Sequence, residues 1–210
     1  MGTSIRSTRV VALLAAAAVI AGIVVFATNV VGQTASACLA KNTSAARLKD
    51  ADGNGHGRVV FGVDSTCKTK VSAHLRGLTE GFHGFHVHTT GVCDPEAAFA
   101  GAGSHWNKAS TDHGNHTGDM PPLLGMDTGD AELEFLTDRF QARELLGGDG
   151  SAVIVHAAPD NLAHIPAASA TGGERYHSHL YDTAGADQDS RNTGDAGTRY
   201  ACGVVKKIQN

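Results

Sequence analysis

Short runs of alternating or β-branched residues, separated by turn residues, constrain the fold of this chain most strongly. The runs are Arg58–Val63, Lys68–Arg76, His83–His88, Ala131–Phe135, Ser151–His156 and Tyr200–Val205. Turn segments such as Gly147–Gly150 lie between them. Several strands of this length predict an antiparallel sandwich or barrel. Residues Arg139–Leu146 are expected to form a helical turn at most.

Composition agrees with an all-β domain and excludes one class of partner. The chain has 26 glycines and only 5% aromatic residues, which suits many turns and long loops better than a helical bundle. Its 17 basic and 21 acidic residues give a net charge of -4. No basic stripe runs along the sequence, so we expect no nucleic-acid partner. A length of 210 residues fits one domain behind a targeting segment.

The N-terminal segment is typical of an exported protein. Two arginines precede an uncharged apolar run from Val10 to Ala27, and Ala35-Ser36-Ala37 has the small-x-small form read by signal peptidase. Residues 1–37 are therefore expected to be a signal peptide or an N-terminal membrane anchor, with cleavage after Ala37 favoured, and residues 38–44 a short linker. We expect a location in the cell envelope or outside the cell.

The cysteines leave alternatives open. Cleavage would make Cys38 the N-terminal residue, where a lipoprotein carries its lipid, although Ala35 stands where lipoprotein signals usually have Leu. The mature protein is thus expected to be soluble, lipid-anchored or membrane-tethered. Export implies an oxidising compartment, in which four cysteines can pair in three ways.

Two long polar segments are expected to carry the function. Residues Thr89–Gly129 and Ala157–Gly197 are too long for hairpin turns, and each begins just after a strand that ends in histidine. His86 and His88 lie two apart on an extended strand, so both imidazoles face the same way. The other candidate ligands are His105, His113, His116, Asp119 and His156. Imidazoles with one carboxylate suit a tetrahedral zinc site.

Several strings in this chain resemble motifs of the copper/zinc superoxide dismutases, in particular the secreted bacterial type. The strings are GFHVH at 84–88, AGSHWN at 102–107, HTGDM at 116–120, VIVH at 153–156 and GDAGTRYACGVV at 194–205. They occur in the family's order. The resemblance implies a copper/zinc superoxide dismutase domain over residues 45–210, folded as an eight-stranded Greek-key β-sandwich or barrel.

The resemblance also implies roles for individual residues. Copper would be bound by His86, His88, His105 and His156, and zinc by His105, His113, His116 and Asp119. His105 would bridge both metals and take part in catalysis. Arg199 would attract and orient superoxide, Asp160 would accept hydrogen bonds from a copper ligand and a zinc ligand, and Cys93 would form a disulfide with Cys202.

The expected reaction is the disproportionation of superoxide to O₂ and H₂O₂ by a copper ion that cycles between oxidation states beside a structural zinc. Two alternatives stay open: a copper-only dismutase, and a non-catalytic envelope protein of the same fold that binds or delivers copper. A homodimer and a membrane tether are further partner hypotheses, which the motifs do not decide.

Some features depart from the family pattern or lie outside it. Only Gly114 and Asn115 separate His113 from His116, fewer residues than family members usually have. His177 and His179 are expected to be solvated loop residues, with metal loading as the alternative. The same solvation is expected for His56, His74, His83 and His164. A second disulfide between Cys38 and Cys67 would pin the N-terminal arm.

Overall fold

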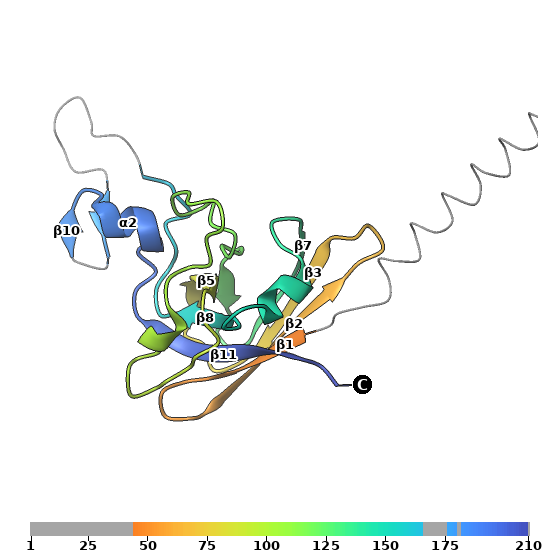
Figure 1. Ribbon diagram of the computed structural model, residues 1–210. Coiled ribbons are helices and arrows are strands. Elements are labelled where there is room, and N and C mark those ends of the chain that lie inside the picture. Colours follow the sequence, from red (N-terminus) through yellow and green to blue (C-terminus); the bar gives the residue numbers. More distant parts are fainter. Residues whose placement is uncertain (1–43, 166–175, 180–181, 210) are drawn as a thin grey trace, which may run out of the picture. The chain divides into compact units, whose positions relative to one another are not determined.

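The computed structural model describes residues 44–165, 176–179 and 182–209, and the regular secondary structure of these residues is mainly antiparallel strand (Figure 1). The main sheet has seven strands in the order β5 (Phe85–His88), β8 (Ala152–His156), β11 (Arg199–Lys207), β1 (Ser44–Lys49), β2 (Gly55–Val63), β3 (Thr69–Leu75) and β7 (Ala131–Thr137). Two short pairs join β4 (Gly81–His83) to β6 (Leu123–Gly125) and β9 (His177–Ser178) to β10 (Thr183–Ala184). Because β11 returns over a long connection to lie beside β1, the strand order is that of a Greek key.

Alternation along the strands separates the core from the solvent. In β1, Ala46 and Leu48 are buried while Arg47 and Lys49 are exposed. The buried residues of β2, including Val59 and Phe61, pack in the same core. The curled sheet therefore buries one apolar face, as the period of two predicts.

The predicted all-β class is confirmed, with differences in individual strands. Strand β1 was not predicted, because its alternation places two cations and a serine among few large apolar residues. The predicted strand His83–His88 is divided at Gly84 into β4 and β5. A Cβ atom on Gly84 would lie 2.4 Å from the Cβ of Ala196, so the second long loop crosses closely over this point.

Helical structure is limited to short pieces in the described part of the chain. The predicted helical turn is present as the 3₁₀ helix Ala142–Leu146, and a second 3₁₀ helix spans Ala100–Ala102. Helix α2 (Gln188–Thr193) lies in the second long loop and was not predicted. No helix among the described residues is long and apolar enough to cross a membrane.

The predicted disulfide between Cys93 and Cys202 is confirmed, and it ties the first long loop to β11 across 109 residues. The predicted leader or anchor over residues 1–37 and the boundary of the linker at 38–44 lie outside the described residues, apart from Ser44 in β1. Cys67 has a bonding partner. Because Cys38 lies outside the described residues, its pairing with Cys67 stays a prediction.

Candidate metal centre

Four histidines from two strands and one loop meet at the end of the main sheet. His86 and His88 lie on β5, and His156 ends the neighbouring strand β8. His105 joins them from the first long loop through an isolated β-bridge to His88. The ring centroids of His86 and His105 are 3.9 Å apart, and those of His86 and His156 4.9 Å. The four form a group whose ligand atoms could hold one metal ion.

Each strand histidine in this group leaves one buried ring nitrogen without a partner. The Nε2 of His86 donates to Asp160, the Nδ1 of His88 to the Gly103 carbonyl, and the Nδ1 of His156 to the Gly197 carbonyl. The unpartnered atoms are Nδ1 of His86, Nε2 of His88 and Nε2 of His156. Since buried polar atoms are nearly always satisfied, lone pairs left in this pattern fit a bound metal ion.

The electrostatics of this group favour neutral imidazoles. Burial lowers the pKa of His86, His88 and His156 below its usual value. Burial and the neighbouring His86 also lower the pKa of His105, to about 3. Neutral imidazole suits copper as well as zinc, so the donor chemistry of this group fits the copper that the sequence implies.

A second group of ligand atoms converges on the other side of His105. The Oδ1 of Asp119 lies 3.1 Å from Nδ1 of His105, 3.4 Å from Nδ1 of His113 and 3.3 Å from Nδ1 of His116. The Nδ1 atoms of His105 and His116 are 3.4 Å apart. A tetrahedral zinc site with bonds of about 2.0–2.1 Å has ligand atoms roughly 3.3–3.4 Å apart. The observed spacings match the edges of such a tetrahedron.

Two buried, ionised carboxylates, Asp119 and Asp160, contact this second group, and their negative charge favours a bound cation. Although burial opposes ionisation, hydrogen bonds from the three histidines hold the pKa of Asp119 well below its usual range. Burial lowers the pKa of His113, but the nearby carboxylates of Asp119 and Asp160 outweigh it and raise the value to about 9. A looser grouping places His86 with His105, His113 and Asp119. The Nδ1 of His116 lies within 3.4 Å of both Asp119 and His105, so His116 is also close enough to supply the fourth ligand.

A glycine and an arginine stabilise the tight turn that brings His113 and His116 together beside Asp119. Gly114 has a φ of 89°, a left-handed conformation that few other residues adopt. Its N–H donates to Oδ2 of Asp119 at 2.7 Å, and the N–H of His116 donates to the same atom at 3.0 Å. The guanidinium of Arg139 donates to the carbonyls of Gly114 and His116 at 2.9 and 3.0 Å. Sequence reasoning missed Arg139, because its contacts are with backbone atoms and leave no motif.

Asp160 joins the two groups. Its Oδ2 accepts a hydrogen bond from Nε2 of His86 at 2.6 Å, and its Oδ1 accepts one from Nε2 of His113 at 2.7 Å. A carboxylate in this position engages Nε2 of both rings, so that Nδ1 of each is the atom left to bind a metal ion. The structure therefore brings Asp160 between one histidine of each group.

Arg199 lies at the first residue of β11, opposite His156 in the strand register. Its two terminal nitrogens donate to the carbonyls of Phe99 and Gly103, each at 2.5 Å. The Gly103 carbonyl also accepts from Nδ1 of His88, so one oxygen holds both the arginine and a metal-group histidine. Burial lowers the pKa of Arg199, yet a guanidinium stays charged at any working pH.

The remaining histidines divide into buried and exposed ones. Nε2 of His177 donates to Oδ1 of Asp182 at 2.8 Å, and His177 lies near His179, with ring centroids 6.3 Å apart. Neither belongs to a group with metal-binding geometry among the described residues. The expectation of solvation was wrong for His56 and His83, which are 6% and 2% exposed.

Backbone and carboxylate contacts explain why these two histidines are buried. The ring nitrogens of His83 lie 2.7 Å from the His156 carbonyl and 2.9 Å from the Thr79 carbonyl. Those of His56 contact the Arg76 carbonyl at 2.8 Å and Asp50 at 3.1 Å. Strand alternation alone does not distinguish a buried, bonded histidine of this kind from a solvated one.

Comparison with known proteins places the chain in a family. The family model described as copper/zinc superoxide dismutase matches residues 55–205. A copper–zinc superoxide dismutase of Mycolicibacterium paratuberculosis is 39% identical over 137 residues, covering 61% of this chain and 57% of the relative. One of Mycobacterium tuberculosis is 38% identical over 137 residues, covering 61% and 54%. An extracellular copper–zinc superoxide dismutase of Brugia pahangi is 31% identical over 172 residues, covering 78% and 75%.

The chain thus spans somewhat more than half the length of the mycobacterial relatives. The family match covers every residue of the metal centre, from His86 on β5 to Arg199 on β11. This chain belongs to the copper/zinc superoxide dismutase family.

Proposed function

We propose that this protein is a superoxide dismutase, which converts two superoxide anions and two protons into O₂ and H₂O₂. The observation that carries the proposal is the position of His105 between two sets of ligand atoms. Its Nδ1 lies 3.1 Å from Asp119 and 3.4 Å from His116, which leaves Nε2 for the group of His86, His88 and His156. A copper ion held by that group would exchange one electron with each superoxide in turn.

The ligand sets follow from the unpartnered atoms and the short contacts. We assign copper to His86, His88, His105 and His156, and zinc to His105, His113, His116 and Asp119. Zinc is redox-silent and would hold His105 and the first long loop in place. The tetrahedral spacing around Asp119 favours this two-metal reading over a copper-only enzyme.

The chain's own residues would bind the substrate and supply protons. Arg199 is held by two carbonyl groups, so its charge is fixed in place for an incoming anion. A fixed charge of this kind can raise the rate of encounter with a charged substrate by roughly 10 to 10³-fold. In one half of the reaction Nε2 of His105 takes up a proton, and in the other it gives the proton to the reduced oxygen product. The second proton comes from solvent.

Changing Arg199 tests the enzyme against a copper carrier of the same fold. In protein loaded with one equivalent each of copper and zinc, Arg199→Ala is expected to keep both metals and to lose about tenfold or more of the superoxide decay rate, measured by stopped flow. Arg199→Lys should recover part of the rate, because lysine restores the positive charge but lacks the two guanidinium nitrogens that bond both carbonyls. The exposed Arg143→Ala serves as the control and should leave the rate unchanged.

Two outcomes would contradict the proposal. A metal-loaded wild-type protein that holds copper tightly without accelerating superoxide decay would be a copper carrier. Equal rates for the wild type and Arg199→Ala would remove Arg199 from the mechanism.

We also propose that the protein acts after export. The apolar run Val10–Ala27, the Ala35–Ala37 motif and the disulfide between Cys93 and Cys202 support this, because disulfides persist in oxidising compartments. Relatives from two nematodes are named extracellular superoxide dismutases. N-terminal sequencing and mass spectrometry of the exported protein should find Cys38 first, and a fragment retaining Val10–Ala27 in membranes would identify an anchor instead.

A homodimer is the remaining partner proposal. Phe82 on β4 and Leu124 on β6 are cross-strand partners and are 54% and 52% exposed, with Met126 44% exposed nearby in sequence. Adjacent exposed apolar side chains favour self-association. In sedimentation experiments the wild type should be dimeric and Phe82→Glu monomeric; a monomeric wild type would contradict the proposal.

A further inference from the structure

A groove of about 610 Å³ lies on the outward side of β11, β1 and β2, away from the ligand atoms of the metal centre. Its basic lining residues are Arg47, Lys49, Arg58, Lys206 and Lys207. Asp50 is the one acidic residue in the lining. Five basic side chains therefore face one acidic side chain, although the whole chain has a net charge of -4. The positive charge is concentrated on this face.

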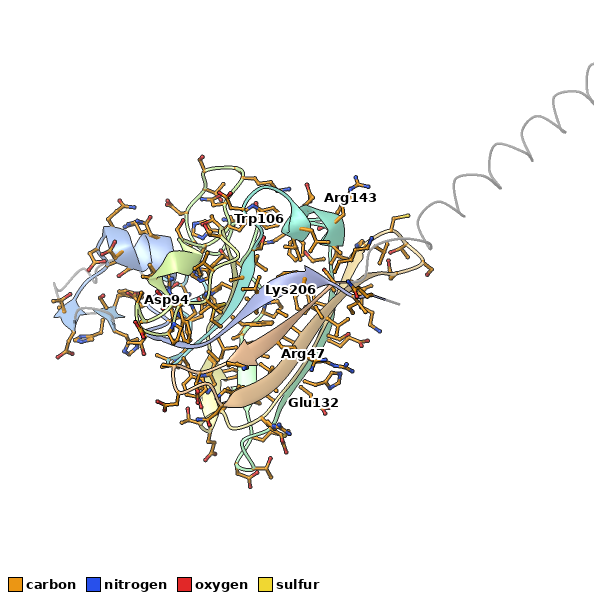
Figure 2. The ribbon with its side chains drawn as sticks, turned by 60° about the horizontal axis from the view of Figure 1, so that its bottom comes forward. Arg47, Asp94, Trp106, Glu132, Arg143 and Lys206 are labelled. Carbon is orange, nitrogen blue, oxygen red and sulfur yellow. A yellow bond between two sulfur atoms is a disulfide. The ribbon has the colours of Figure 1, made fainter. Side chains whose placement is uncertain are left out.

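Strand register assembles the groove from distant parts of the sequence. Arg47 on β1 is the cross-strand partner of Arg58 on β2, and Lys206 on β11 is the partner of Ala45 on β1. Figure 2 is turned so that β1 and β11 lie in front, with Arg47 and Lys206 labelled on them. Neighbouring strands are about 5 Å apart, and alternate residues along a strand about 7 Å. The cations therefore form a two-dimensional array that no stripe in the sequence reveals.

The cations of the groove have no ionic partners within the described part of the chain. Several other lysines do have them: Lys68 pairs with Asp138, Lys70 with Glu134 and Lys108 with Glu144. Like charges directly opposite on adjacent strands are destabilising, which applies to Arg47 and Arg58. An external anion would relieve this repulsion.

The floor of the groove is apolar and recessed. Ala45, Val60 and Val204 line it between the charged side chains. Gly203 also lines the groove. The groove thus combines an apolar floor with a cationic rim.

We propose that this groove binds an extended anionic polysaccharide, whose ring faces lie on the apolar floor and whose sulfate or carboxylate groups pair with the rim cations. A single-stranded nucleic acid is disfavoured, because such sites stack bases on exposed aromatic rings. The aromatic residue of the lining, Phe99, is only 3% exposed. A bilayer is disfavoured because the lining is concave and offers Ile208 as its large exposed apolar side chain. Binding would retain the protein on acidic surface glycans.

The test compares matched polymers and matched variants. Binding of the purified protein to dextran sulfate, to neutral dextran and to phosphatidylglycerol vesicles is measured by titration calorimetry at physiological ionic strength, where exposed charges are already screened. The wild type should bind dextran sulfate and neither neutral dextran nor the vesicles. Arg47→Gln/Lys206→Gln should weaken the binding about tenfold, since exposed ion pairs contribute modestly each.

The control Lys68→Gln/Lys70→Gln changes the net charge by the same amount at residues outside the groove lining and should shift the affinity less than twofold. Thermal melting of all variants checks that they fold, and superoxide decay rates should be unaffected because neither pair contacts the metal centre. Three results would overturn the proposal: no binding of dextran sulfate, equal weakening in both double variants, or stronger binding to the vesicles than to dextran sulfate.

Discussion

At the scale of single residues, the metal centre is defined by what each imidazole does with its second nitrogen. Asp160 accepts hydrogen bonds from Nε2 of His86 and His113, while backbone carbonyls accept hydrogen bonds from Nδ1 of His88 and His156. Those contacts choose the tautomers before any metal arrives. The ligand geometry therefore depends on Asp160 as much as on the ligands themselves.

Asp160→Asn tests this dependence. An amide offers one acceptor oxygen in place of two carboxylate oxygens, so one of the two histidines loses its acceptor. We expect zinc affinity to fall about 10- to 100-fold, measured by competition with a chelator of known affinity. The control Asp138→Asn alters a carboxylate whose side chain is 80% exposed and should change nothing. Unchanged zinc affinity in Asp160→Asn would remove Asp160 from the support of the site.

The sequence could predict the histidines and Asp119 because their chemistry is carried by side chains at motif positions. It could not predict Arg139, which donates to two backbone carbonyls more than twenty residues away. Nor could it show that His83 and His56 are buried, since both donate to backbone carbonyl oxygens that only the fold brings near. Side-chain motifs survive in a sequence, whereas side-chain contacts with backbone atoms leave no pattern.

At the scale of elements, helix α2 supports the zinc side of the centre through its C-terminal glycine. Gly194 ends the helix in a left-handed conformation with a φ of 70°. A Cβ atom there would lie 2.3 Å from Nε2 of His113 and 2.8 Å from Oδ1 of Asp160. The second long loop is thus packed directly against a zinc-group histidine.

Gly194→Ala is expected to displace His113 or Asp160 and to reduce zinc binding to well below one ion per chain, measured by metal analysis after dialysis. Gly185→Ala is the matched control. Gly185 also has a left-handed φ, 87°, but no atom lies within 4 Å of its Cβ position. In both variants the alanine is strained at a positive φ, which destabilises the fold by roughly 1 kcal/mol. The variants therefore differ only in the overlap of the new Cβ atom with His113 and Asp160. Equal zinc content in the two variants would contradict the proposed packing.

The disulfide between Cys93 and Cys202 links the first long loop, which carries the Phe99 and Gly103 carbonyls, to β11, which carries Arg199. Cys93→Ser/Cys202→Ser should therefore lower the free energy of unfolding by about 2–4 kcal/mol, measured by urea denaturation. The rate of superoxide decay should fall further than the metal content, because Arg199 loses its fixed acceptors. A double variant with wild-type stability and rate would show that the loop needs no covalent tie.

Element prediction succeeded where hydrophobic alternation was strong and failed where it was weak. The β-branched residues of β8 and the core positions of β2 and β3 made those strands predictable. Strands β9 and β10 have two residues each, and helix α2 has six polar residues stabilised by the Asp187 cap. Such elements depend on tertiary contacts rather than on periodicity.

At the scale of the whole molecule, bound metal ions would hold the first and second long loops against the main sheet. Four buried nitrogens without partners face the ligand groups, and buried unsatisfied atoms destabilise a fold. Removing metal with a chelator should therefore lower the melting temperature by roughly 10 °C, if bound metal contributes about 4 kcal/mol. Hydrogen exchange should accelerate in residues 103–120 and 156–165 and stay slow in β2 and β3. Uniform acceleration would contradict a role confined to the loops.

The all-β fold class followed from patterns that a single sequence carries and the Greek key from the family resemblance, while the basic groove followed from neither. Arg47, Arg58 and Lys206 become neighbours only through the pairing of β1 with β2 and β11. Sequence reasoning counted charges along the chain and found no stripe. Charge clusters built by sheet topology require the fold itself.

Anomalous X-ray diffraction at the copper and zinc edges, on crystals of the protein loaded with both metals, would locate each ion among its ligands. We expect a copper peak among His86, His88, His105 and His156, and a separate zinc peak among His105, His113, His116 and Asp119, so that His105 contacts both. Copper at its site with no zinc peak would identify a copper-only enzyme. A single peak outside these ligands would contradict the account.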